Sequence, residues 1–80
     1  MNYELWDVET GNCLGWFTAE DEALAFVRSL LDRYGTNYAD ALELGTEDAQ
    51  GNFLGSSSGA SLIARAEITQ LTGAIASTPQ

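Results

Sequence analysis

The sequence predicts a small α+β domain: a four-stranded, mainly antiparallel sheet in ββαββα order, with the helices packed on one face. Two glycine-containing turns, at 10–12 and 48–51, each separate a pair of strand-like segments. A stretch with helical spacing of apolar residues follows each pair. A chain of 80 residues forms one domain with a thin core. We therefore expect a single domain over residues 1–72 and a frayed tail over 73–80.

The first predicted hairpin runs from Tyr3 to Phe17, and Gly11 supplies the positive φ that a tight turn needs. A type I turn with Gly11 as a bulge would place Trp6 opposite Leu14. One face of the hairpin would then carry Trp6, Val8, Leu14 and Trp16, and the other Tyr3, Leu5, Cys13 and Phe17. Both faces are apolar, whereas a sheet that faces water normally alternates apolar and polar residues.

An amphipathic helix is predicted next, with Thr18 as its N-cap and Gly35 as the residue that ends it. Acidic residues occupy its first turn and Arg33 lies near its end, as the helix dipole favours. The stripe expected to face the core contains Ala23, Phe26, Val27, Leu30, Leu31 and Tyr34, with Leu24 at its edge.

The second half repeats the pattern. A strand is predicted over 38–47, with Leu42 and Leu44 on one side and Glu43 on the other. After the turn at 48–51, residues 52–56 can return as a fourth strand, and 55–59 read as a loop. Ser58 can cap a second helix over about 60–71, with Leu62, Ile63, Ala66 and Leu71 facing inward.

Five stretches of the chain form a recognisable set: LWDVETGN and LGWFT near the N-terminus, EALAFVR in the first predicted helix, and ALELG and GASLIAR further on. Through these stretches, residues 3–66 or so resemble a group of small uncharacterised bacterial ββαββα proteins. These motifs consist of turn glycines, caps and core apolar residues. The resemblance therefore implies the order of the elements, and it carries over no catalytic residue.

The charge balance is the strongest compositional signal, because twelve acidic residues face three arginines, for a net charge of −9. Nucleic acids and anionic membranes are bound through lysine and arginine, so the composition disfavours both as direct partners. The acidity serves solubility in one interpretation. In the other, the acidic surface meets a basic protein partner.

The residues that are missing exclude most enzyme chemistry. The chain has no histidine and no lysine, which removes histidine-based triads, imidazole bases and lysine nucleophiles. One cysteine cannot form an intramolecular disulfide or a structural zinc site, so we expect no metal and no cofactor, and a cytoplasmic location. Cys13 is predicted to be a small buried hydrophobe, and Asp7 to hydrogen-bond the backbone of the 10–11 turn.

The two tryptophans are the most informative residues. As core residues they would need no explanation, and for at least one of them that is the expectation. However, helices on one face leave the other face of the sheet uncovered, and large exposed apolar patches usually mark an interface. We therefore predict a two-fold homodimer, with an interface formed by Tyr3, Trp6, Val8, Leu14 and Trp16.

Three functional hypotheses follow from these observations. The leading one is a non-enzymatic protein-interaction module, a small acidic dimer that binds another protein, as an inhibitor or antitoxin-like regulator would. The second is a carboxylate-based enzyme or small-ligand binder with its site at the dimer interface. The third is a structural subunit of a larger assembly.

Overall fold

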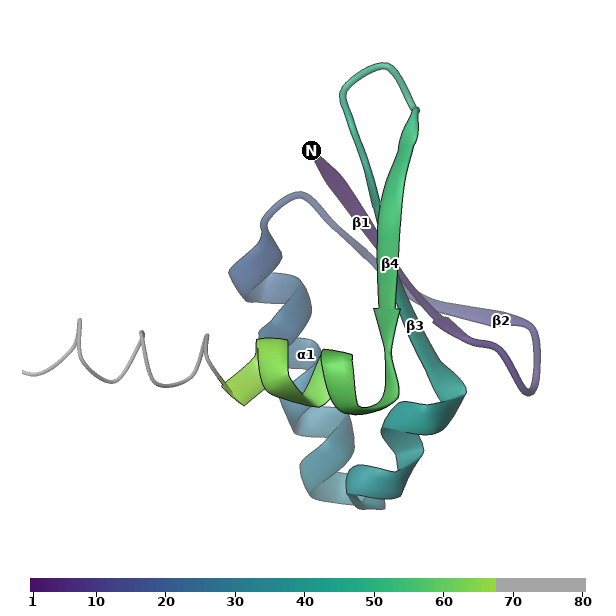
Figure 1. The fold of residues 1–80 in the computed structure, drawn as a ribbon, viewed down its shortest axis with the longest axis vertical. Coiled ribbons are helices and arrows are strands. Elements are labelled where there is room, and N and C mark those ends of the chain that lie inside the picture. Colours follow the sequence, from purple (N-terminus) through teal and green to yellow (C-terminus); the bar gives the residue numbers. More distant parts are fainter. Residues whose placement is uncertain (68–80) are drawn as a thin grey trace, which may run out of the picture.

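The computed structural model describes residues 1–67 of the chain. Its elements are, in order, β1 (Asn2–Asp7), β2 (Asn12–Phe17), α1 (Glu20–Tyr34), the 3-10 helix η1 (Thr36–Ala41), β3 (Leu42–Glu47) and β4 (Phe53–Ser58). Residues 59–67 are helical. The predicted order ββαββα and the α+β class are therefore confirmed (Figure 1).

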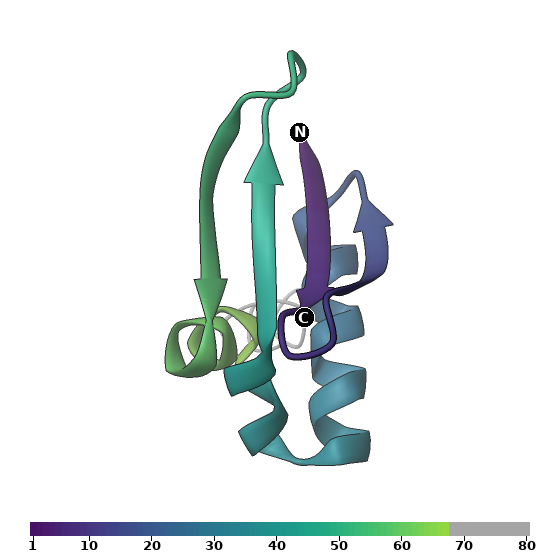
Figure 2. The same ribbon diagram turned by 90° about the vertical axis from the view of Figure 1, so that its right-hand side faces the viewer.

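The four strands form one antiparallel sheet in the order β2-β1-β3-β4. The two hairpins are joined side by side, because β1 pairs with β3 in the middle of the sheet. Both α1 and the helix at 59–67 pack on the same side of the sheet (Figure 1). Figure 2 views the sheet from the other side, with the helices behind the strands.

The core lies between the sheet and the helices. Leu5 of β1 and Leu44 of β3 face each other across the central pair of strands, and both are fully buried. The other large side chains that are almost completely buried are Leu24, Val27, Leu42 and Leu62. Leu42 and Leu44 lie on the inner side of β3 as predicted, so the period-2 alternation of this strand was a reliable signal.

The first hairpin forms, but its register differs from the prediction beyond the middle of β1. Leu5 pairs with Gly15 as expected, whereas Trp6 pairs with Cys13 because Leu14 is an extra residue in β2. This bulge exchanges the faces of two neighbours. Leu14 packs against the core, and Cys13 takes the place that Leu14 was predicted to occupy beside Trp6.

The helix α1 ends at the predicted residue but begins differently. Its N-cap is Ala19, and no side chain caps it, so the assignment of this role to Thr18 was wrong. At the other end, Gly35 has a φ of 95° and its N–H donates to the carbonyl of Leu31 at 2.8 Å. Tyr34 was expected in the core, yet it is 60% exposed at the last position of α1.

The segment before β3 is a 3-10 helix and not a strand, which corrects the prediction for residues 38–41. The tight coil is anchored at both ends. The N–H of Tyr38 donates to the carbonyl of Gly35 at 3.1 Å, and the carbonyl of Ala41 accepts from the N–H of Val8 at 2.8 Å. Composition was misleading here, because tyrosine favours strands, whereas Tyr38 in this segment contacts Asp7 of the first hairpin.

The second hairpin turns where predicted, at 48–51, with Gly51 at a φ of 83°. Asp48 organises the turn, because its carboxylate accepts hydrogen bonds from the N–H groups of Gln50 and Asn52 at 2.9 Å each. The strand β4 then continues to Ser58, so the expected loop at 55–59 is mostly strand. Leu54 is an extra residue in this strand, opposite the step from Thr46 to Glu47.

The second helix also forms, with Leu62 and Ala66 buried and Ile63 partly buried as predicted. Its predicted end, Leu71, and the tail predicted to fray, 73–80, lie outside the described residues.

Candidate functional site

The candidate site is the side of the sheet that faces away from the helices, here called the open face. The alternation of side chains along each strand, together with the pairing register, shows which residues of the four strands lie on this face. The set consists of Asn2, Glu4, Trp6, Cys13, Trp16, Glu43, Gly45, Glu47, Phe53, Ser56 and Ser58. Among residues 1–67, no helix or loop covers this side (Figure 2).

Three aromatic side chains of the open face are exposed. Trp16 is 66% exposed, Phe53 64% and Trp6 37%. Neither tryptophan is in the core, so the expectation that at least one would be buried was wrong. The interior is filled mainly by leucine, valine and alanine side chains, and Tyr3 is the one buried aromatic residue among residues 1–67. The aromatic residues thus lie where they meet solvent or a partner.

Carboxylates alternate with these aromatic rings. Glu43 lies directly opposite Trp6 on the neighbouring strand, and Glu4 lies directly opposite Trp16. Side chains opposed in this way have Cβ atoms about 4.5–5.5 Å apart. Each tryptophan therefore has a carboxylate as its cross-strand neighbour.

Gly45 and Phe53 make a close contact at the far end of the open face. A Cβ atom on Gly45 would lie 3.5 Å from Cε1 of Phe53, so the phenylalanine ring lies over the bare backbone of the glycine. Gly45 is buried although it faces outward. The ring is thereby held against the sheet while most of its surface stays exposed.

The sequence-based prediction of this site was right in part. Trp6 and Trp16 lie on the open face, and Val8, directly after β1, is exposed beside it. Tyr3 and Leu14 do not belong to it, because Tyr3 is 8% exposed and both contact the core under the helices. Sequence reasoning missed Phe53, since the bulge at Leu54 reverses the alternation of β4.

A second cluster surrounds Asp7, the only buried charged side chain among residues 1–67. Its Oδ1 accepts from the backbone N–H groups of Glu9 and Thr10 at 3.0 and 3.1 Å, and its Oδ2 accepts from the Tyr38 hydroxyl at 2.9 Å. The Thr10 N–H, followed by the Tyr38 hydroxyl, holds the pKa of Asp7 below its ordinary value, although burial acts in the opposite direction. The prediction that Asp7 binds the backbone of the turn is confirmed.

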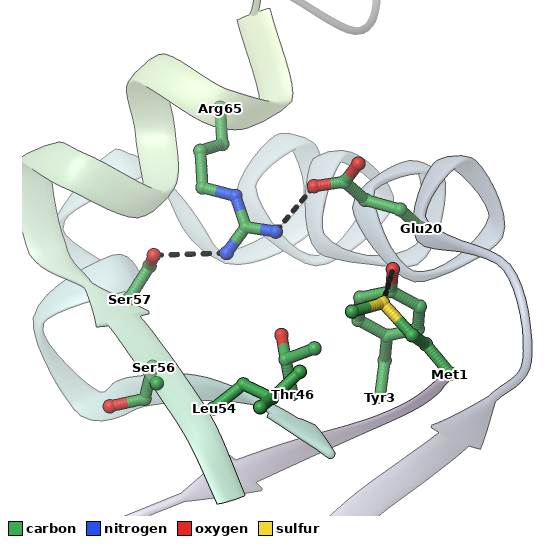
Figure 3. A pocket seen from close by; sticks show the side chains of 9 residues that line it. Met1, Tyr3, Glu20, Thr46, Leu54, Ser56, Ser57 and Arg65 are labelled. Atoms are coloured by element: carbon green, nitrogen blue, oxygen red, sulfur yellow. Dashed lines mark hydrogen bonds and ion pairs between the residues drawn. The ribbon is translucent and has the colours of Figure 1, made fainter. Parts of the chain in front are cut away.

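A hollow of about 470 Å³ lies on the helical side, between β4, the start of α1 and the helix at 59–67 (Figure 3). The Arg65 guanidinium lines this hollow. It donates through Nη1 to Ser57 Oγ at 2.9 Å and forms an ion pair through Nη2 with Glu20. Glu20 is the single carboxylate of the lining. Ser57 and Glu20 thus hold the Arg65 guanidinium, which connects β4, α1 and the helix at 59–67. With Glu20 alone, the hollow lacks the pair of carboxylates that acid/base catalysis requires.

Cys13 is half-buried beside Trp6 on the open face, so the prediction of a buried Cys13 on the Leu5 side of the hairpin was wrong. Within residues 1–67, no group of three or more acidic, cysteine or histidine side chains is placed to hold a metal ion. No helix of this part of the chain is both long enough and apolar enough to cross a membrane.

No family model, curated protein or solved structure matches the chain.

Proposed function

We propose that this protein is a non-enzymatic protein-interaction module and that the open face is its docking surface. The observation that carries the proposal is the exposure of Trp6, Trp16 and Phe53 on one uncovered side of the sheet. Tryptophan is among the residues that contribute most to binding energy at interfaces. Here both tryptophans of the chain lie on the same surface.

The position of these residues is costly for an isolated small domain. A chain of 80 residues has few large side chains with which to build a core, and burial of a large aromatic residue would contribute about 1.5–3 kcal/mol. The core is nevertheless built mainly from leucine, valine and alanine, with Tyr3 as its buried aromatic residue, while the tryptophans lie outside it. Contact with a partner would bury the aromatic surface that stays exposed after folding.

The proposal can be tested by capture experiments with paired variants. The open-face variant combines Trp16→Ser with Phe53→Ser, and the control is Tyr34→Ser, which removes an equally exposed aromatic ring from the end of α1. Tagged wild type and both variants are incubated with the same native lysate at low salt. The captured proteins are then compared by quantitative mass spectrometry, and circular dichroism verifies that each variant is folded.

We expect one or more proteins to be captured by the wild type and by Tyr34→Ser, and lost from the open-face variant. Light scattering on the purified wild type and variants detects a second copy as the partner. Dimer formation counts as docking on this face if only the open-face variant abolishes the dimer. Identical capture profiles and identical masses for all three folded proteins would refute the proposed function.

A further inference from the structure

We infer that the open face binds a basic segment of a partner protein, one that presents arginine side chains to Trp6 and Trp16. This inference rests on the proposed function, because it names the occupant of the same surface. It follows from the distribution of charge over the two sides of the molecule.

The open face carries carboxylates without cations. Glu4, Glu43 and Glu47 lie on it, whereas lysine and arginine are missing from it among the described residues. The chain has three arginines in all and no lysine, and none of them falls in 68–80. No basic side chain of this protein therefore neutralises these three glutamates from within the face.

All three arginines are engaged on the helical side. Arg65 is paired with Glu20, and Arg28 donates through Nη1 to the carbonyl of Ala66 at 3.3 Å. The guanidinium of Arg33 lies 5.5 Å from the centre of the Tyr34 ring at the end of α1. All three arginines therefore lie on the helical side of the sheet, and none lies among the exposed Trp6, Trp16 and Phe53 rings of the open face.

This distribution disfavours a second copy as the occupant. A two-fold dimer through the open face would gather the three glutamates of each copy into one interface, with no arginine or lysine of either copy's open face among them. Burying unpaired charges is strongly unfavourable, and like charges in an interface suppress that pairing. The predicted homodimer would have to meet this cost, whereas a partner that supplies the cations avoids it.

Arginine fits the face better than lysine does. A guanidinium is planar, so it can stack on an indole ring and at the same time form two parallel hydrogen bonds with a carboxylate. The pairs Trp6–Glu43 and Trp16–Glu4 each place these two groups next to each other. The face therefore offers two adjacent positions for guanidinium groups.

The test uses a short peptide of alternating arginine and glycine as the probe, with lysine and citrulline versions of the same length. Both tryptophans lie on the open face, so tryptophan fluorescence reports binding there, and calorimetry gives Kd. Glu4→Gln combined with Glu43→Gln removes the two cross-strand carboxylates. The matched control, Asp21→Asn with Glu22→Gln, changes the net charge equally in the first turn of α1, on the helical side.

We expect saturable binding of the arginine peptide, weaker binding of the lysine peptide and none of the citrulline peptide. Loss of each carboxylate should raise the Kd of the arginine peptide by about tenfold, the usual effect of removing a hydrogen bond to a charged group. The control should bind nearly as the wild type does, because it keeps the open face intact. Trp16→Leu, which keeps every charge, should also weaken binding.

Equal weakening in the two charge variants would overturn the inference, since net charge alone would then explain the affinity. Equal binding of the lysine and arginine peptides would overturn the stacking geometry and with it the choice of arginine. If no peptide binds while the open-face variant, Trp16→Ser with Phe53→Ser, still abolishes capture of a partner or a second copy, the face is a docking surface with a different occupant, and only this inference fails.

Discussion

The hydroxyl of Tyr38 donates a hydrogen bond to Oδ2 of Asp7 at 2.9 Å, across 31 residues of sequence. The same carboxylate binds the N–H groups of the turn that joins β1 to β2. One buried side chain thus fixes the first hairpin to η1. Because β3 begins directly after η1, this contact also defines where the central strand pair starts.

Tyr38→Phe should destabilise the protein, because it leaves Oδ2 of Asp7 without its hydroxyl donor. Loss of one such hydrogen bond lowers the Tm of a domain of this size by about 4–8 °C. Thermal unfolding followed by circular dichroism measures the change. Tyr34→Phe removes a hydroxyl from the exposed neighbouring ring and should leave the Tm nearly unchanged; equal losses would contradict the role of the Asp7 contact.

The contribution of Asp7 to stability should disappear in acid. The folded-state pKa of Asp7 lies below its ordinary value of 3.8, so its contribution is present above that pH and is lost as the pH falls through the folded-state pKa. The Tm difference between wild type and Asp7→Asn should therefore be largest near neutral pH and shrink below about pH 4. A difference that stays constant with pH would show that the carboxylate charge does not matter.

At alkaline pH the contact between Tyr38 and Asp7 should be lost through ionisation of its donor, the Tyr38 hydroxyl. The hydrogen bond to Asp7, followed by burial, raises the pKa of Tyr38 above its ordinary value of 10.0. A raised folded-state pKa contributes stability that is complete below the ordinary value and is lost as the pH rises through the folded-state one. Wild type should thus lose Tm above pH 10 more steeply than Tyr38→Phe does, as monitored by thermal scans at increasing pH.

Removing an aromatic ring from the open face should cost little stability. Trp16→Ser changes a side chain that is 66% exposed, so the free energy of unfolding should move by no more than about 0.5 kcal/mol. Leu44→Ala, in the core directly behind this face, should cost about 2–5 kcal/mol. Urea denaturation of the two variants makes the comparison, and a large loss in Trp16→Ser would mean that the indole supports the fold.

The same substitution at two glycines should have opposite effects. Gly35→Ala forces an L-residue into a φ of 95° and should destabilise the protein by about 1–3 kcal/mol. Gly45→Ala introduces a Cβ at ordinary contact distance from Phe53, at a position without positive φ, and should stabilise by about 0.4–1 kcal/mol. Urea midpoints of both variants against wild type check the two signs.

Much of the fold could be predicted from the sequence, because its main signals are local. The helix end at Gly35 and the turn at Gly51 are both set by a residue that accepts positive φ. The faces of Leu42 and Leu44 follow from simple alternation. Each of these features depends on a few neighbouring residues, which a sequence displays directly.

The errors arose where tertiary contacts override the local pattern. The extra residues Leu14 and Leu54 reverse the alternation within their strands, and no turn residue announces either of them. This is why Leu14 was assigned to the wrong face and Phe53 was overlooked. Residues 38–41 form a 3-10 helix instead of a strand, and Tyr38 there contacts Asp7, a partner that is remote in sequence.

Those two extra residues have a further consequence at the margins of the sheet, where one lies in each outer strand. A strand edge with unpaired N–H and C=O groups can recruit another molecule and begin a fibril, and proteins commonly prevent this with lysine or proline. Strands β2 and β4 contain neither lysine nor proline. The bulges interrupt the regular spacing that such growth requires. An aromatic-rich sheet can in this way present its surface to a partner without templating its own aggregation.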